Sequence, residues 1–122
     1  MENATILESL GLPKQEAQAY LALLKLGGSL ASVIAKEMGV KRTTVYAILK
    51  SLAAKGLALV YFRKNRKFYY PVKPHKVASI FERKLDAFNG LIPMLQSMEK
   101  KQTQILGMRF IETKGELEEY HM

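Results

Sequence analysis

The sequence predicts a mainly α-helical chain that carries a small β-hairpin and continues into a long helix. Apolar residues recur at helical spacing in two short segments joined by a glycine-containing turn, residues 29–39 and 43–55. The spacing then changes to that of strands over residues 57–72, and a long helical segment follows from residue 75. Together these observations predict a winged helix-turn-helix followed by a long coiled-coil-type helix.

The chain of 122 residues has room for one compact domain and an appended element. We expect a winged helix-turn-helix domain, a dimerisation helix and the start of a truncated or absent effector domain at residues 1–74, 75–106 and 107–122. In the last segment the sequence favours a short strand, a turn and an acidic helical start at Met108–Thr113, Lys114-Gly115 and Glu116–Tyr120.

Two helices are expected before the helix-turn-helix. The first is Thr5–Leu10, which Gly11 ends. Pro13 suits the first position of the second helix, where a backbone N–H has no helical partner. The core-facing side of this second helix follows i, i+3, i+4, i+7 spacing and consists of Ala17, Tyr20, Leu21 and Leu24. Gly27-Gly28 ends it.

The helix-turn-helix comes next. Its first helix has Ser29 as a suitable N-cap and Gly39 at its C-terminal end. The apolar side of that helix is expected to consist of Leu30, Val33, Ile34 and Met38. The second helix, Thr43–Lys55, is closed by Gly56, and with Arg42 at its start it is the recognition helix 42–55. Its buried side is expected to consist of Val45, Ile48, Leu49 and Leu52.

A hairpin with a basic tip is expected after this helix. Leu57–Phe62 and Lys67–Val72 are rich in β-branched and aromatic residues, and the polar residues 63–66 between them form the turn. Pro71 restricts the second strand to a sheet edge, or else lies at the strand's end. Only about half of the alternating aromatic side chains can face the core, and the set is Tyr61, Phe62, Phe68, Tyr69 and Tyr70. The others cover the sheet or a dimer partner, in preference to stacking on single-stranded bases.

A long helix is expected from His75 to about Gln104, after Pro74. Its apolar residues follow the 4-3-4-3 spacing of a coiled-coil seam, which consists of Phe81, Leu85, Phe88, Ile92 and Leu95. An exposed apolar stripe favours homodimerisation, and the alternative is a helix that folds back on its own winged domain. Gly90 and Pro93 predict a kink or a break within this helix.

The positive charge is concentrated in one segment. The net charge is +8, and residues 41–76 contain ten basic residues and no acidic one. The ten are Lys41, Arg42, Lys50, Lys55, Arg63, Lys64, Arg66, Lys67, Lys73 and Lys76. Such a distribution is typical of a surface that binds a polyanion. The alternative is a basic face that only contacts solvent.

This charge lies where a winged helix contacts double-stranded DNA, through the recognition helix in the major groove and the wing, residues 63–67, on the backbone or the minor groove. The predicted DNA-binding residues are Ser29, Ser32, Lys41, Arg42, Thr43, Thr44, Tyr46, Lys50, Arg63, Lys64, Asn65, Arg66 and Lys67. Arg42 and Lys50 are the candidates for guanine contacts. For Ser29, Ser32 and Thr43 the alternative role is helix capping alone.

Other classes of function find little support. The chain has no cysteine, which excludes disulfides and thiolate sites and suits the cytoplasm. His75 and His121 stand alone, so we expect no enzyme, no metal site and no cofactor. No apolar run is long enough for a membrane span. The main alternative function is a winged-helix scaffold for protein interaction or dimerisation without specific DNA binding, and RNA binding ranks third because A-form duplexes hide their major groove.

The order and spacing of several short motifs resemble a known family. They are Leu10-Gly11-Leu12, Glu16-Ala17, Tyr20-Leu21-Ala22-Leu23-Leu24, Ile34-Ala35, Gly39-Val40, Thr44-Val45-Tyr46, Leu49, Leu52 and Lys55-Gly56-Leu57. Over residues 5–76 the sequence resembles the N-terminal domain of TrmB-like regulators, with a wing exit at Tyr69, Val72 and Pro74. The resemblance implies a dimeric winged helix that acts on promoters. It implies a sugar-type effector only where a full effector domain exists.

Overall fold

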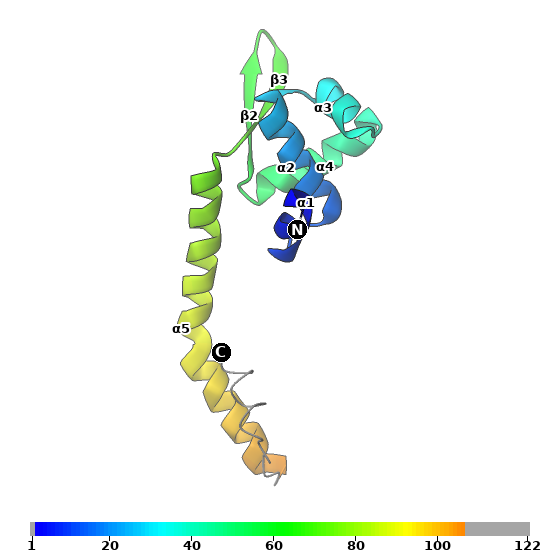
Figure 1. Cartoon of the computed structure of the whole chain (residues 1–122). Coiled ribbons are helices and arrows are strands. Elements are labelled where there is room, and N and C mark those ends of the chain that lie inside the picture. The colour runs from blue at the N-terminus through cyan, green and yellow to red at the C-terminus, as the bar shows by residue number, and fades with distance from the viewer. Residues whose placement is uncertain (1, 107–122) are drawn as a thin grey trace. The chain divides into compact units, whose positions relative to one another are not determined.

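The computed structural model describes residues 2–106 (Figure 1). The elements, in chain order, are α1 (Asn3–Ser9), α2 (Lys14–Leu26), β1 (Ser29–Leu30), α3 (Ala31–Met38), α4 (Arg42–Ala54), β2 (Ala58–Arg63), β3 (Arg66–Pro71) and α5 (Pro74–Leu106). The predicted winged helix-turn-helix with a long following helix is confirmed. The strand, turn and acidic helix expected at 108–120 lie outside the described residues.

The chain divides into two compact units, one that ends at Phe81 and one that begins at Glu82. The first two turns of α5 therefore belong to the winged unit, where Val77 is buried and Phe81 packs against the core. The domain boundary expected at residue 74 stays a prediction.

The helix-turn-helix is formed by α3 and α4. Gly39 ends α3 in the left-handed conformation, with φ of 73°, and the N–H of Val40 donates to the carbonyl of Ala35 at 3.0 Å. Lys41 is then the N-cap of α4, with no side-chain capping bond. The alternative capping role of Thr43 is therefore wrong, because Thr43 lies inside the first turn.

The prediction that Ser29 caps α3 is also wrong. Ser29 and Leu30 are extended and form β1, in which Ser29 pairs with Tyr69 and Leu30 pairs with Phe68. Because this pairing holds the backbone extended, α3 begins only at Ala31, and its N-cap is Leu30. Gly28 precedes the strand with φ of 96°, and a Cβ there would lie 2.3 Å from a ring carbon of Tyr70. The turn into β1 therefore requires glycine at position 28, because a side chain there would overlap the Tyr70 ring.

The sheet has three antiparallel strands in the order β1-β3-β2. Arg63 and Arg66 are the last pair of the hairpin, and the loop between them is Lys64-Asn65. Both loop residues have positive φ, 50° and 64°, which gives the twist that suits a two-residue hairpin. Pro71 is the last residue of β3. The alternative that it makes β3 an edge strand is wrong, because β3 is central.

The core of the winged unit is formed by α2, α3, α4 and the sheet. Its fully buried larger side chains are Leu23, Ile34, Val45, Leu49, Leu52 and Leu57. The hydroxyl of Tyr20 donates to the carbonyl of Val72 at 2.7 Å and so ties α2 to the exit of the hairpin. Burial raises the pKa of this phenol.

The predicted buried row of α4 is confirmed, and Ala17 and Tyr20 of α2 and Ile34 of α3 are buried as predicted, but one predicted residue in each of these two helices is exposed. Leu24 of α2 is 39% exposed and Val33 of α3 is 40% exposed. Since α2 contacts α1, α3, α4 and β3, its buried residues cover a wide arc, and one apolar row does not define its orientation. The short helix α3 buries only Ala31, Ile34 and Ala35.

The helix α5 continues through Gly90 and Pro93 (Figure 1). Of the two predicted alternatives, a break near Gly90 is therefore wrong, and a kink there stays a prediction. Proline removes one backbone donor, and the hydrogen bonds on either side of it are sufficient to keep the helix continuous. None of the described helices is long and apolar enough to cross a membrane.

Candidate nucleic-acid interface

Side chains of α4 divide cleanly between the core and the surface. Val45, Leu49 and Leu52 are buried, and this fixes the rotation of the helix. Arg42, Tyr46 and Lys50 follow at i, i+4 and i+8 on another side, and all three are exposed. The helix therefore presents a guanidinium, a phenol and an ammonium group along one exposed row.

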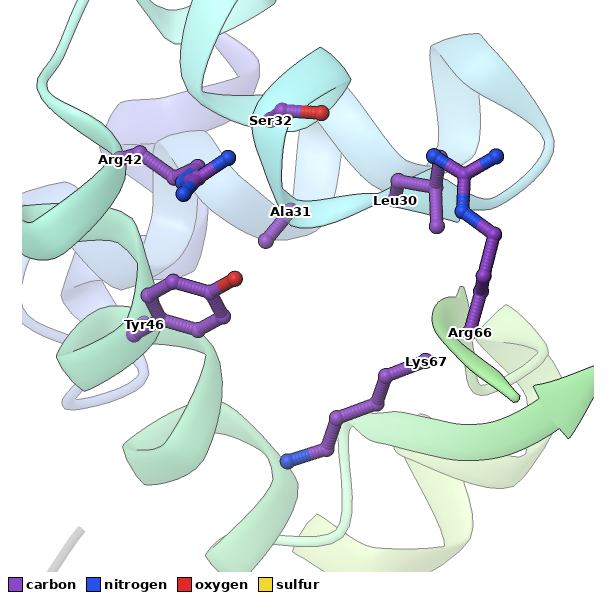
Figure 2. Close-up of a pocket in the computed structure, with 7 residues that line it drawn as sticks. All are labelled: Leu30, Ala31, Ser32, Arg42, Tyr46, Arg66 and Lys67. Atoms are coloured by element: carbon purple, nitrogen blue, oxygen red, sulfur yellow. The ribbon is translucent and has the colours of Figure 1, made fainter.

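A hollow of about 220 Å³ lies between α3, α4 and β3 (Figure 2). We call it the basic hollow, and its lining consists of Leu30, Ala31, Ser32, Arg42, Tyr46, Arg66 and Lys67. Figure 2 shows Arg42 and Tyr46 reaching it from α4, and Arg66 and Lys67 from the wing. Residues far apart in the chain thus place three cations around one concave site.

The first turn of α3 forms another wall of the basic hollow, through Ala31 and Ser32. The first N–H groups of a helix have no partner within it and carry partial positive charge. The hydroxyls of Ser32 and Tyr46 add further donors. The chemistry of this set is that of a site for an oxyanion such as a phosphate group.

The tip of the wing adds more cations outside the hollow. Arg63, Lys64 and Asn65 are exposed and do not line the hollow. The guanidinium carbon of Arg63 lies 5.3 Å from the centre of the Phe68 ring, and Nζ of Lys67 lies 5.6 Å from that of Tyr69. These cation–π contacts hold two of the basic side chains against the sheet.

One cation of residues 41–76, the segment without acidic residues, is not available at this surface. Lys55 pairs with the carboxylate of Glu16, which is 8% exposed, and the Ser51 hydroxyl donates to the same carboxylate at 2.7 Å. Another ion pair joins Lys25 to Glu37 at 2.8 Å, away from the basic hollow. The cations of the basic hollow are therefore not neutralised by any described carboxylate.

The structure thus brings together five of the predicted residues, which are Ser32, Arg42, Tyr46, Arg66 and Lys67. Lys41, Thr43, Lys50 and the wing tip are exposed outside the hollow, and Thr44 is half-buried. Ser29 belongs to β1 and does not line the hollow. Sequence reasoning missed Leu30 and Ala31, which carry no polar signal and line the hollow only through the path of the backbone.

The second unit presents an apolar face on α5. Among the predicted seam residues, Leu85, Phe88 and Leu95 are 59%, 52% and 38% exposed, and Ile92 is half-buried. The heptad reading missed a second row, formed by Leu91, Met94 and Met98, whose members are all exposed. Their spacing of three and four residues is the signal that identifies such a row.

No group of three or more potential metal ligands occurs within the described part of the chain.

Comparison with known proteins agrees with this geometry. A family model described as sugar-specific transcriptional regulator TrmB matches residues 7–75. The sugar-sensing transcriptional regulator TrmBL1 of Pyrococcus furiosus is 45% identical over 71 residues, which are 58% of this chain and 20% of TrmBL1. The chain thus matches only a fifth of the length of that relative.

Solved structures extend the likeness at the level of the fold. TrmBL2, described as an archaeal chromatin protein with a novel mode of DNA binding, has a TM-score of 0.72 at 22% identity. The match covers 93% of this chain and 44% of TrmBL2. A protein described as a possible transcriptional regulator from Methanosarcina mazei has a TM-score of 0.61 at 13% identity, over 76% of this chain and 83% of that one.

The family model spans more than half of the sequence, and TrmBL1 is 45% identical to this chain over 71 residues. The winged helix found in the structure is also the fold of TrmBL2. The chain therefore belongs to the TrmB family of transcriptional regulators.

Proposed function

We propose that this chain binds double-stranded DNA in a sequence-specific manner as a dimeric transcription regulator. The observation that carries the proposal is the basic hollow, where Arg42 of α4 and Arg66 and Lys67 of the wing surround one concave site. The names of TrmBL1 and TrmBL2 state transcription regulation and DNA binding for those proteins, which supports the same role here.

In this proposal α4 lies in the major groove, and Arg66 and Lys67 on the wing side of the basic hollow hold a phosphate of the adjoining backbone. Arg42 and Lys50 contact base edges, with guanine O6 and N7 as the preferred acceptors. The wing, residues 63–67, contacts the backbone or the minor groove. Phosphate contacts fix the position of the protein, and base contacts select the sequence.

Dimerisation is proposed through α5. The exposed apolar seam from Leu85 to Leu95 is typical of a helix that packs against a partner helix. Two copies of the domain then match two half-sites that lie about 34–36 Å apart, or a multiple of that spacing. Phe81 contributes less to this seam, because it already packs against its own winged core.

The alternative function, a scaffold without specific DNA binding, does not require the cations of the basic hollow. A scaffold needs the apolar face of α5 but not three cations around one hollow. Sugar sensing is stated by the name of TrmBL1, of which this chain matches 20%, and we propose it only where an effector domain is present.

The decisive experiment selects bound duplexes from a random pool at two ionic strengths. We expect recovery of a palindromic consensus and a steep loss of affinity with salt. The variant Arg42→Ala, run in parallel, should recover a less defined consensus, and Arg42→Lys retains the charge as a control. Recovery of unenriched sequence by the wild-type protein would contradict specific binding, and no retention at low salt would favour the scaffold.

A further inference from the structure

Phe62 is an exposed aromatic residue beside the tip of the wing. Its side chain is 73% exposed, the highest value among the exposed large hydrophobic residues of the described chain. It is the penultimate residue of β2 and precedes Arg63. Figure 1 shows the turn between β2 and β3 as a projection from the helices of its unit.

The register of the hairpin determines which side of the sheet carries this ring. Phe62 pairs with Lys67, and residues directly opposite each other in an antiparallel pair project from the same face. Lys67 lines the basic hollow together with Arg42 and Tyr46. Phe62 also shares its face with Val60 and with Tyr69, which is buried, so it projects from the sheet face that is turned towards the helices, and Tyr61 projects from the other face.

The surroundings of Phe62 are cationic. Arg63 follows it and Lys67 lies across from it, and residues 41–76 contain no acid. In the described hairpin the cation–π contacts use the rings of Phe68 and Tyr69, not that of Phe62. A partner that covers this ring must present an apolar surface within a polyanion. The minor groove of DNA has this combination, because deoxyribose walls lie between two rows of phosphates.

We propose that Phe62 is an apolar contact of the wing in the minor groove, where its ring packs against deoxyribose while Arg63 and Lys67 contact the flanking phosphates. This inference rests on the proposed DNA binding and adds to it a contact that carries no charge. Its contribution to affinity is therefore independent of salt, unlike that of the neighbouring cations.

The test is a fluorescence-anisotropy titration of the whole chain with a labelled duplex at several salt concentrations. Phe62→Ala should weaken binding about tenfold and leave the salt slope unchanged. Phe62→Leu, which retains most of the apolar surface, should restore most of the loss. Arg66→Ala should instead lower the slope by about one.

Tyr61→Ala is the matched control, because Tyr61 is the next residue, is 53% exposed and projects from the opposite face. It should bind like the wild type, and thermal melts of each variant verify folding. A minor-groove ligand such as netropsin should reduce the difference between Phe62→Ala and the wild type.

Equal affinities of Phe62→Ala and the wild type would overturn this inference and leave the proposed function intact. Equal losses in Phe62→Ala and Tyr61→Ala would also overturn it, since the effect would not depend on the face. Failure of the wild type to bind any duplex would instead reject the proposed function.

Discussion

Lys55 donates a hydrogen bond to the buried carboxylate of Glu16, a residue 39 positions earlier in the chain. Lys55 and Lys50 belong to the same helical segment and the same acid-free run of sequence. Only Lys50 is exposed, whereas Lys55 joins the C-terminal end of α4 to α2. Two lysines that are equivalent in the sequence therefore have different roles in the structure.

This difference predicts opposite effects of the same substitution. Lys50→Met should weaken DNA binding and lower the salt slope by about one, because one phosphate-neutralising or base-contacting cation is lost. Lys55→Met should leave the slope unchanged and reduce the free energy of unfolding. The reduction should be about 1–2 kcal/mol, below the usual cost of breaking a fully buried pair, because Lys55 is partly exposed.

Salt-dependent anisotropy and urea denaturation of both variants check this prediction. Glu16→Gln is a useful companion, because it keeps an acceptor for Ser51 and removes the charge that Lys55 needs. A lowered salt slope in Lys55→Met would show that Lys55 reaches DNA, contrary to its pairing with Glu16.

Arg66 and Arg42 line the same hollow but should differ in what they contribute. Arg66→Ala removes a phosphate contact and should weaken binding to all sequences by a similar factor. Arg42→Ala should cost about 1–3 kcal/mol at its preferred base pair and less at others. Titration of each variant against matched and single-mismatch duplexes separates the two. Identical discrimination in both variants would contradict the division of roles.

Local patterns account for the parts of the fold and site that the sequence could predict. The row Val45, Ile48, Leu49 and Leu52 fixes how α4 is rotated, and the same periodicity assigns Arg42, Tyr46 and Lys50 to the surface. The basic tip of the wing is equally local, since a hairpin places adjacent residues together.

The features that the sequence did not predict depend on distant partners. β1 has two residues, which are too few for an alternating pattern. It forms because Ser29 and Leu30 pair with residues of β3. The pairing of Glu16 with Lys55 has no sequence signal for the same reason. The exposure of Leu24 depends on which neighbours surround α2, which one helical row does not specify.

Gly28, which precedes β1, and Gly39, which follows α3, are a matched pair of glycines for testing the turn into β1. Both have positive φ, but a Cβ at Gly28 would overlap the Tyr70 ring, whereas Gly39 has open space around it. Gly39→Ala should cost about 1 kcal/mol for the left-handed conformation alone. Gly28→Ala adds the displacement of a packed ring and should cost about 3 kcal/mol. Urea denaturation gives both values, and equal costs would show that the ring moves freely.

The apolar face of α5 predicts that charges introduced into it will separate the proposed dimer into monomers. Ile92→Glu with Leu95→Glu places two charges in the proposed seam, and burial of unpaired carboxylates in a helix–helix contact is strongly unfavourable. We expect the double variant to be monomeric by light scattering while its winged unit keeps its thermal melt, because the core of that unit ends at Phe81.

Asn89→Glu with Ser97→Glu is the control, since it adds the same charge to the polar side of the same helix. This variant should keep the mass of the wild type. If the seam variant also keeps that mass, the exposed row of Leu91, Met94 and Met98 is the next surface to change in the same way. A dimer that survives both sets of substitutions would exclude residues 91–98 of α5 as the dimer contact and leave only the earlier seam residues Leu85 and Phe88.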